Sequence, residues 1–136
     1  MSQRTLVLLK PDAVRRGLVG EILGRFEAKG LTIDAMDLRT IDGDAADQHY
    51  AEHVERDFYP PLRTFITSGP LVAMVLSGDE AVEVVRGLLG STDGRKAAPG
   101  TIRGDLSLSN RENLAHGSDS PESAEREIKL WFPDLG

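Results

Sequence analysis

Apolar residues along this chain gather in a few short continuous runs. RTLVLL at residues 4–9 stops at Lys-Pro-Asp, and PLVAMVLSG at residues 70–78 is dense in Val, Leu and Met. Runs of this length and composition predict buried strands. Residues 31–41 begin with alternating apolar and polar positions, which predicts a half-buried strand, and NLAH at residues 113–116 predicts a brief one.

Helices are predicted where apolar residues recur at helical spacing. The predicted helices cover residues 18–29, 44–53, 60–67, 79–90 and 120–132. Gly30 and Gly90 end two of them, and Ser120 caps the last, with Pro121 as its first residue. Residues 91–112 form a long Gly/Ser/Pro-rich loop, and loops of this length in compact domains are usually functional or disordered.

The predicted elements follow the order β-α-β-α-β-α-β. This order indicates an α+β fold in which helices cover a four-stranded antiparallel sheet, and we expect the ferredoxin-like βαββαβ arrangement. The length of 136 residues predicts a single domain, residues 1–136.

Composition narrows the range of functions. The formal net charge of −6 disfavours a nucleic-acid-binding surface, although a small cationic pocket stays possible. The chain has no cysteine, which excludes disulfides and thiolate metal sites. The N-terminal apolar run is too short for a signal peptide, and no stretch reaches membrane-spanning length, so we expect a cytoplasmic protein without a membrane partner.

The strongest candidate for chemistry is a histidine in NLAHGSDSPESAEREI, residues 113–128. Gly117 is expected to let the chain turn tightly after His116, directly before a helix N-terminus that favours anions. Glu127 lies well inside the predicted helix and can reach back to one imidazole nitrogen. The other nitrogen is then free to act as a nucleophile.

Several other polar side chains lie at strand ends and in loops, where they can hold a polyphosphate. They are Lys10, Arg86, Thr92, Arg103 and Asn113. Arg can bind phosphate oxygens through two N–H groups at once. For any one of these residues alone, an ordinary surface position is the preferred interpretation. The chain contains no GxxxxGK[ST] loop, so side chains must bind any nucleotide phosphates.

A competing pattern is HYAEH at residues 49–53, which matches the H-x-x-E-H motif of zinc peptidases. Two histidines four residues apart on a helix can share a metal ion. The motif is only five residues long and needs a further carboxylate ligand and a sizeable cleft, so accidental agreement is the preferred interpretation.

Longer blocks carry a resemblance to a known family. They are TLVLLKPDAV, SGPLVAMVL, GSTDGRKAAPGTIRGD, NLAHGSDS and SAEREIKLWF. Their order and spacing resemble those of the nucleoside diphosphate kinases along nearly the whole chain. The resemblance implies ping-pong transfer of the γ-phosphate from a nucleoside triphosphate, typically ATP, to a nucleoside diphosphate, through a phosphohistidine and with broad base and sugar tolerance.

The resemblance also implies roles for individual residues. His116 matches the histidine that is phosphorylated on Nδ1, and Glu127 matches the glutamate bound to its other nitrogen. Positions that bind the substrate in the family fall on Lys10, Tyr50, Phe58, Leu62, Arg86, Thr92, Arg103, Asn113 and Gly117. In this set Arg86, Thr92 and Arg103 match phosphate contacts, and Phe58 matches the ring on which the base stacks. Mg²⁺ is expected to arrive on the nucleotide phosphates, without a metal site of the protein's own.

The resemblance also bears on oligomeric state and on residues that differ from the family pattern. The resemblance implies a homo-oligomer, either a hexamer or a tetramer. Three residues depart from the family pattern. Gly94 stands where many relatives carry proline, which predicts a more mobile loop. Pro61 replaces a common glycine, and Asn110 is polar where some relatives place an apolar residue against the base. The alternative function is a non-catalytic, nucleotide-binding regulatory protein of the same fold.

Overall fold

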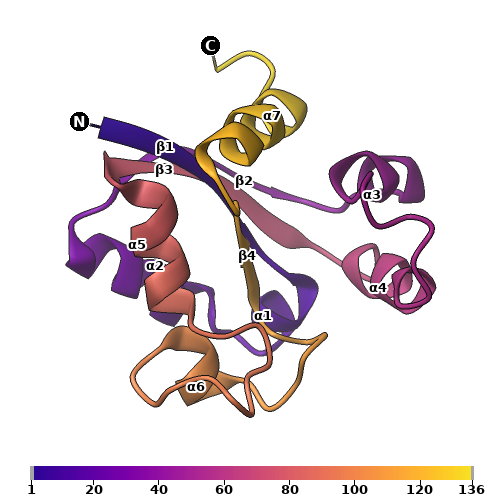
Figure 1. The fold of residues 1–136 in the computed structure, drawn as a ribbon, viewed down its shortest axis with the longest axis horizontal. Coiled ribbons are helices and arrows are strands. Elements are labelled where there is room, and N and C mark those ends of the chain that lie inside the picture. Colours follow the sequence, from indigo (N-terminus) through magenta and orange to yellow (C-terminus); the bar gives the residue numbers. More distant parts are fainter. Residues whose placement is uncertain (1, 136) are drawn as a thin grey trace.

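The computed structural model describes residues 2–135. In this range the strands are β1 (Ser2–Leu9), β2 (Thr32–Arg39), β3 (Leu71–Asp79) and β4 (Ala115–Gly117) (Figure 1). The helices are α1 (Pro11–Arg15), α2 (Val19–Lys29), α3 (Gly43–His49), α4 (Tyr59–Ile66), α5 (Ala81–Leu89), α6 (Ile102–Leu106) and α7 (Pro121–Trp131). No helix of the described chain is long and apolar enough to cross a membrane.

The strands form one antiparallel sheet in the order β2-β3-β1-β4. This arrangement confirms the prediction of an α+β, ferredoxin-like βαββαβ fold with a four-stranded antiparallel sheet covered by helices. β1 and β3 lie in the centre, and β2 and the short β4 form the edges.

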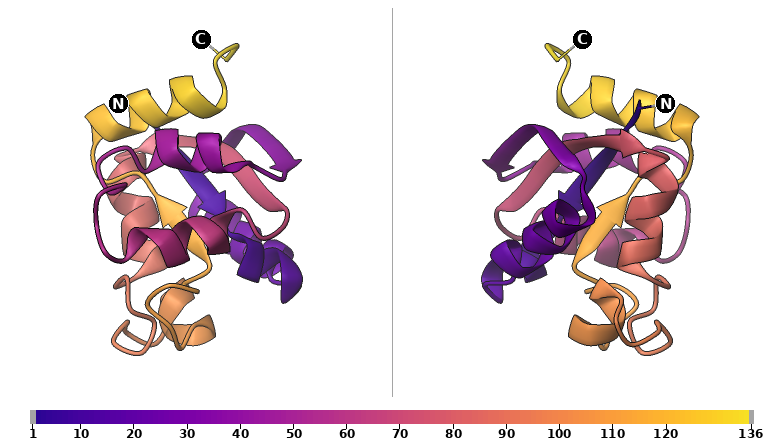
Figure 2. Two further views of the ribbon diagram at one scale, coloured as in Figure 1. Left: turned by 90° about the vertical axis from the view of Figure 1, so that its right-hand side faces the viewer. Right: turned by 90° about the vertical axis from the view of Figure 1, so that its left-hand side faces the viewer.

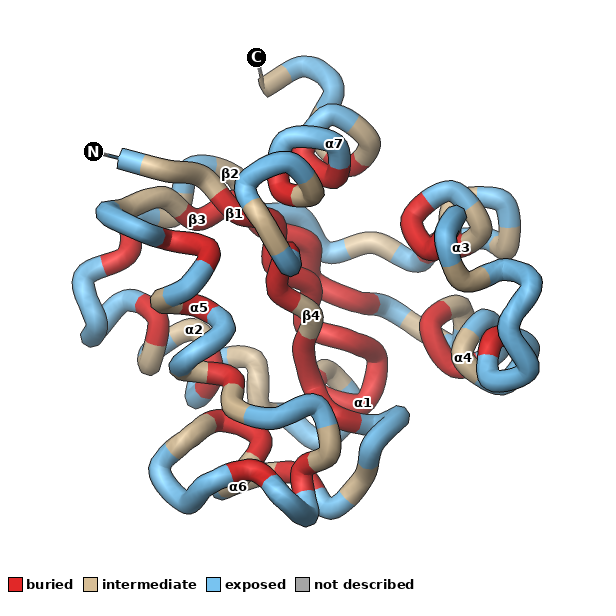
Figure 3. Tube along the Cα trace, in the orientation of Figure 1, coloured by how far each residue is buried: buried red, intermediate tan, exposed pale blue. Residues whose placement is uncertain are grey.

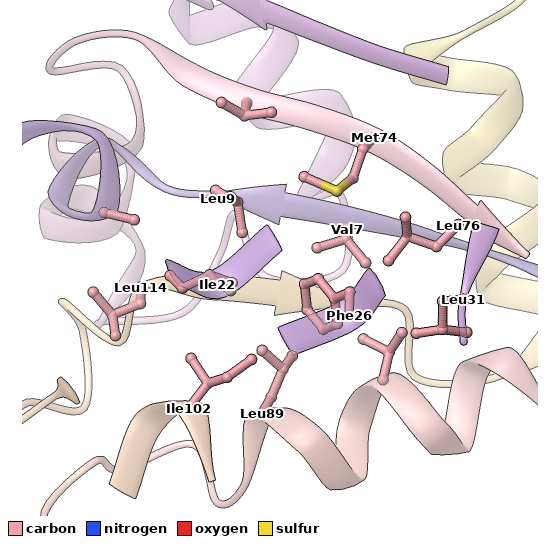
Figure 4. Packing of buried hydrophobic residues seen from close by; sticks show 14 of the residues in the cluster. Val7, Leu9, Ile22, Phe26, Leu31, Met74, Leu76, Leu89, Ile102 and Leu114 are labelled. Carbon is pink, nitrogen blue, oxygen red and sulfur yellow. The ribbon is translucent and has the colours of Figure 1, made fainter. Parts of the chain in front are cut away.

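Helices cover both faces of the sheet (Figure 2). A first core cluster lies between the sheet and α1, α2 and α5, and includes Val7 and Leu9 of β1 (Figure 4). A second core cluster lies between the opposite face and α3, α4 and α7, and includes Leu6 and Leu8. Because successive side chains of a strand point to opposite faces, a strand buried on both faces reads as a continuous apolar run. Figure 3 shows the resulting buried centre of the sheet, with exposed residues on the outer helices.

The helix ends follow the expected capping chemistry. Gly30 ends α2 with φ of 107°, and the Ser120 side chain accepts a hydrogen bond from the Ser123 N–H at the start of α7. The cap of α3 is Asp42, whose side chain accepts from the Ala45 N–H. Asp44 adds a negative charge to the first turn of this helix.

Three features differ from the predicted pattern. α1 and α6 were not expected, because five-residue helices show no helical period. β2 contains a register shift between Ile33 and Ala35. The shift places Ile33 against the first core cluster and Ala35 against the second, so the apolar alternation does not continue on one face.

Candidate active site

The sheet determines which way His116 points. His116 lies in β4 opposite Leu8 of β1, and paired residues on neighbouring strands project from the same face. Since Leu8 belongs to the second core cluster, the imidazole projects to the side covered by α3, α4 and α7. Glu127 belongs to α7, one of the helices on this side of the sheet.

Glu127 binds the ring through a short hydrogen bond. Its Oε1 lies 2.9 Å from His116 Nε2 and also accepts a hydrogen bond from Ser118 Oγ at 2.8 Å. Burial acts to raise the pKa of Glu127, but the hydrogen bonds from His116 and Ser118 and the neighbouring positive charges hold it below its usual value. The ionised carboxylate places the ring proton on Nε2 and leaves the Nδ1 lone pair free.

Gly117 has a different role from the expected one. It belongs to β4 and is not among the glycines with positive φ, so it does not form a tight turn after His116. A Cβ at Gly117 would lie 2.9 Å from Val85 Cγ1 and 3.2 Å from Leu89 Cδ1. The glycine therefore lets α5 pack closely against the strand that carries the histidine.

A second histidine lies behind the first. His49 is buried, and its ring meets the His116 ring edge-on, with centroids 4.7 Å apart. Burial, with smaller contributions from nearby cations, lowers the pKa of His49 well below its usual value and keeps the ring neutral. Its Nδ1 accepts a hydrogen bond from Trp131 Nε1 at 3.0 Å, so the ring proton resides on Nε2.

This hydrogen bond bears on whether the site could hold a metal. One ligand atom each from His49, His116 and Glu127 lies within 4.8 Å of the others, the only such group in the described chain. Neither nitrogen of His49 has a free lone pair, because Trp131 occupies one and a proton the other. The group is better explained as the packed support of His116 than as a metal centre. It does not include His53, so the H-x-x-E-H interpretation gains no support.

A cavity of about 670 Å³ opens in front of His116. The residues predicted to bind the substrate all contribute to its wall, namely Lys10, Tyr50, Phe58, Leu62, Arg86, Thr92, Arg103, Asn113 and Gly117. Glu127 does not, because it lies behind the ring. The wall carries five basic residues (the others are Arg95 and Arg111) and one acidic residue, Asp119, so the cavity is cationic although the chain is acidic.

Lys10 and Arg103 are the buried cations of this wall. The Lys10 ammonium donates to Asn113 Oδ1 at 2.9 Å. Burial, together with the nearby charge of Arg103, lowers the pKa of Lys10 to about 8. The Arg103 guanidinium donates to the carbonyls of Asn113, Gly90 and Ala115 at 3.2, 3.0 and 2.5 Å. Arg103 therefore braces the loop before β4 in addition to facing the cavity.

Arg86 and Thr92 are more accessible than these two cations, whereas Tyr50 is buried. Arg86 pairs with Asp119 at 2.8 Å on the surface, and Thr92 is exposed. The Tyr50 hydroxyl is buried and has no hydrogen-bond partner among residues 2–135. Burial raises the pKa of Tyr50, so the hydroxyl stays protonated and keeps a donor that no residue in this range uses.

One part of the wall is apolar. The Phe58 side chain is 50% exposed, which is unusual for a large aromatic residue, and it precedes α4, which carries Leu62. Pro61 lies in the first turn of α4, where a missing N–H costs nothing. Asn110 faces the same cavity from the loop 91–112.

Comparison with known proteins decides the family. The family model described as nucleoside diphosphate kinase matches residues 3–135. The chain belongs to the nucleoside diphosphate kinase family. A nucleoside diphosphate kinase of a Nocardioides species is 78% identical over 135 residues, which is 99% of this chain and 100% of that protein. The enzyme of that name from Rhodococcus jostii is 67% identical over 136 residues, 99% of this chain and 98% of that protein.

Solved structures of the family have the same fold. A halophilic nucleoside diphosphate kinase from Halobacterium salinarum in complex with CDP matches with a TM-score of 0.96 at 48% identity, covering 98% of this chain and 90% of that one. A nucleoside diphosphate kinase from Encephalitozoon cuniculi matches with a TM-score of 0.95 at 40% identity, covering 97% and 90%. The resemblance inferred from the sequence blocks is thereby confirmed.

Sequence reasoning missed other residues of this site. Arg95 and Arg111 lie in the loop 91–112, for which the sequence left both a functional and a disordered interpretation, and their charge was the available signal. The hydrogen bond from Trp131 to His49 joins residues 82 apart, so no local pattern indicates it. Ser118 lies in the NLAHGSDS block, but a serine before a helix is typical of capping, so its hydrogen bond to Glu127 was not predicted.

Proposed function

We propose that this protein transfers the γ-phosphate of a nucleoside triphosphate, typically ATP, to a nucleoside diphosphate in two half-reactions through phosphorylated His116. Membership of the nucleoside diphosphate kinase family supports the reaction type. The observation that carries the residue assignment is the contact of 2.9 Å between His116 Nε2 and Glu127 Oε1 at the wall of a cationic cavity.

In the first half-reaction the Nδ1 lone pair of His116 attacks the γ-phosphorus. An N–P bond forms, the bond to the oxygen bridging the β- and γ-phosphates breaks, and the diphosphate leaves with that electron pair. The ring gains positive charge as the N–P bond forms, and the Glu127 carboxylate at Nε2 stabilises it. In the second half-reaction a terminal oxygen of another diphosphate attacks the phosphorus, the N–P bond breaks, and the neutral ring is restored.

Positioning and charge neutralisation supply most of the catalysis in phosphoryl transfer. Lys10, Arg86 and Arg103 lie around the cavity and are the groups proposed to bind the phosphate oxygens, with Thr92, Asn113 and the Tyr50 hydroxyl as hydrogen-bonding partners. Mg²⁺ usually binds nucleotide phosphates with few protein carboxylates. This wall, with Asp119 as its carboxylate, fits such an ion, which would neutralise phosphate charge when bound.

The half-exposed Phe58 ring, beside Leu62, is proposed to stack on the base. Stacking uses the face of a base and not its hydrogen-bonding edge, which agrees with broad base tolerance. The main contacts of the proposed mechanism are to phosphates, so tolerance of the sugar is expected as well.

The proposal extends to the chain's organisation. We infer that residues 1–136 act as one domain in the cytoplasm and assemble as a homo-oligomer, a hexamer or a tetramer. Support for assembly comes from β2, an edge strand whose Met36 and Leu38 side chains are 52% and 63% exposed. An uncovered edge strand with apolar side chains is suited to contact a second copy. Sedimentation velocity of the wild type and of Leu38→Glu tests this part.

The function is tested by incubation with γ-labelled ATP. Wild type should gain an acid-labile, base-stable label, which a chase with unlabelled diphosphate should remove as labelled triphosphate. His116→Ala should gain no label and still bind nucleotide, whereas His53→Ala serves as the matched histidine control and should label normally. A label retained by His116→Ala would refute the assignment of the nucleophile. Binding without any label on wild type would instead favour the regulatory alternative.

A further inference from the structure

The turn directly before β4 has a backbone conformation that leucine rarely adopts. Leu114 has φ of 74°, and the Ala115 N–H donates to the Asn113 carbonyl at 2.8 Å. A hydrogen bond across a single central residue with φ near +75° marks the rare, strained form of the γ-turn. A side chain at this φ brings Cβ close to the backbone carbonyl, so glycine would be the unstrained choice.

This γ-turn brings two cations and the His116 strand together. It directs the carbonyls of Asn113 and Ala115 to the same Arg103 guanidinium. The Asn113 side chain also accepts from the Lys10 ammonium. His116 follows Ala115 directly in β4, so the conformation of Leu114 sets the position of these groups relative to the imidazole.

A buried carboxylate holds the turn from the side. Asp12, in α1, is 2% exposed, and its Oδ2 accepts a hydrogen bond from the Leu114 N–H at 3.1 Å. The Lys10 N–H donates to the Leu114 carbonyl at 2.8 Å. The γ-turn's own hydrogen bond leaves the N–H of its central residue unused, so this buried N–H needs a partner elsewhere. Asp12 supplies that partner.

We propose that Asp12 is a positioning residue for phosphoryl transfer, because its carboxylate keeps Leu114 in the strained γ-turn and so aligns Asn113 and Arg103 with His116. The inference rests on the proposed function of the site. Without the acceptor, Leu114 relaxes towards negative φ, where leucine is unstrained, and the Asn113 and Ala115 carbonyls no longer converge on Arg103.

A double-mutant cycle separates this role from a general contribution to stability. The variants are Asp12→Leu, Leu114→Gly and the pair, with Asp12→Asn as the conservative substitution and Asp134→Ala as the control for loss of an exposed carboxylate. Leu removes the acceptor and keeps the same branching and number of non-hydrogen atoms, whereas Asn keeps an acceptor oxygen. Each variant is assayed below its unfolding midpoint for the single-turnover rate of His116 phosphorylation and for nucleotide Kd.

Asp12→Leu is expected to slow phosphorylation of His116 by about tenfold or more. A small misalignment of Asn113 and Arg103 raises the barrier to phosphoryl transfer, and even a small rise in that barrier gives a tenfold loss of rate. Asp12→Asn should recover most of the rate, and Asp134→Ala should match wild type. In the Leu114→Gly background the same Asp12→Leu substitution should cost less than about threefold, because glycine forms the turn without a tether. Loss of the buried Leu114 side chain is common to both variants that carry Leu114→Gly and cancels in the comparison.

Two results would overturn the inference. The first is an equal cost of Asp12→Leu with and without the Leu114→Gly substitution, which is the behaviour of a merely structural residue. The second is an Asp12→Leu variant with the wild-type rate. His116→Ala in the same assay keeps the two proposals apart: a label on that variant refutes the site assignment, whereas an unlabelled His116→Ala combined with an uncoupled cycle refutes only the role of Asp12.

Discussion

Replacing Glu127 by glutamine removes one negative charge from behind His116 and keeps the side-chain size. The carboxylate is 5% exposed, and its Oε1 accepts from His116 Nε2 and Ser118 Oγ at 2.9 and 2.8 Å. A hydrogen bond to a charged group contributes about 1.5–3 kcal/mol, and one between neutral groups about 0.5–1.5 kcal/mol. The bond to the ring therefore loses about 1–1.5 kcal/mol.

Most of this loss falls on the transition state, because the ring becomes positive as Nδ1 bonds to phosphorus. We expect the rate of His116 phosphorylation to fall about tenfold in Glu127→Gln. Glu127→Ala, which also removes the ring's anchor, should be slower still and retain measurable transfer. Nucleotide Kd should stay unchanged in both, since Glu127 does not contribute to the wall of the large cavity.

Rapid-quench measurement of a single turnover gives the rate, and equilibrium titration gives Kd. An unchanged rate in Glu127→Gln would remove the carboxylate from the mechanism. A rise in Kd that matched the fall in rate would show that Glu127 acts through substrate binding.

The same carboxylate affects stability at acid pH. Its pKa in the folded chain lies below the usual value of 4.5. A carboxylate with a lowered folded pKa adds stability that is present above the unfolded pKa and is lost as the pH falls through the folded value. The difference in free energy of unfolding between wild type and Glu127→Gln should therefore be constant near pH 7 and shrink below pH 4.5. A difference that persists unchanged in strong acid would contradict the assigned hydrogen bonds.

Further predictions concern the cavity and the packing behind it. Because the pKa of Lys10 is lowered to about 8, nucleotide affinity should weaken as the pH rises through 8. Lys10→Arg should flatten this pH dependence in titrations, and a wild-type Kd that does not change with pH would contradict the prediction. Arg103→Ala should reduce the transfer rate more than nucleotide binding, and equal losses of rate and binding would indicate ground-state binding alone. Because three backbone carbonyls lose their donor, Arg103→Lys should restore little of the rate or of the thermal stability. Gly117→Ala should destabilise the fold by about 1–3 kcal/mol in chemical denaturation through overlap with Val85. Gly24→Ala, where a Cβ meets no atom within 4 Å in the interior of α2, is the matched control and should stabilise by about 0.5–1 kcal/mol, so equal effects would refute the overlap.

The regular part of the fold could be predicted because its sequence signals are local. β1 and β3 are buried on both faces, so their apolar runs are unbroken, and Gly30 and Ser120 have the backbone and side-chain chemistry that helix ends require. α6 is only five residues long and its cap, Thr101, resembles any other loop threonine. The register shift of β2 coincides with a change of phase in the apolar pattern, from Ile33 and Ala35 to Met36 and Leu38. The exposure of Met36 and Leu38 was not foreseen, because apolar residues in a strand are typical of a buried face.

Residues of the candidate site could be predicted where they belong to a recognisable family pattern. They could not be predicted where their role depends on contacts between segments that are distant in the sequence. His116 and Glu127 are eleven residues apart, and the structure brings them into hydrogen-bonding contact. Asp12 and Leu114 are 102 residues apart, so their hydrogen bond depends on the pairing of β1 with β4. Gly117 was assigned to a turn because glycine permits turns, whereas the limiting space lies against Val85 on a different element.

Gly94 constrains how the loop 91–112 can be exchanged with that of a relative. Its N–H donates to the Ser109 carbonyl at 3.1 Å, and a Cβ there would overlap the Ser107 backbone. Proline, the residue that many relatives are expected to carry at this place, offers no N–H and adds a ring. Residue 94 and residues 107–109 therefore have to be exchanged together. A chimaera whose crossover falls between them should fold poorly, whereas a chimaera that exchanges the whole loop should fold normally.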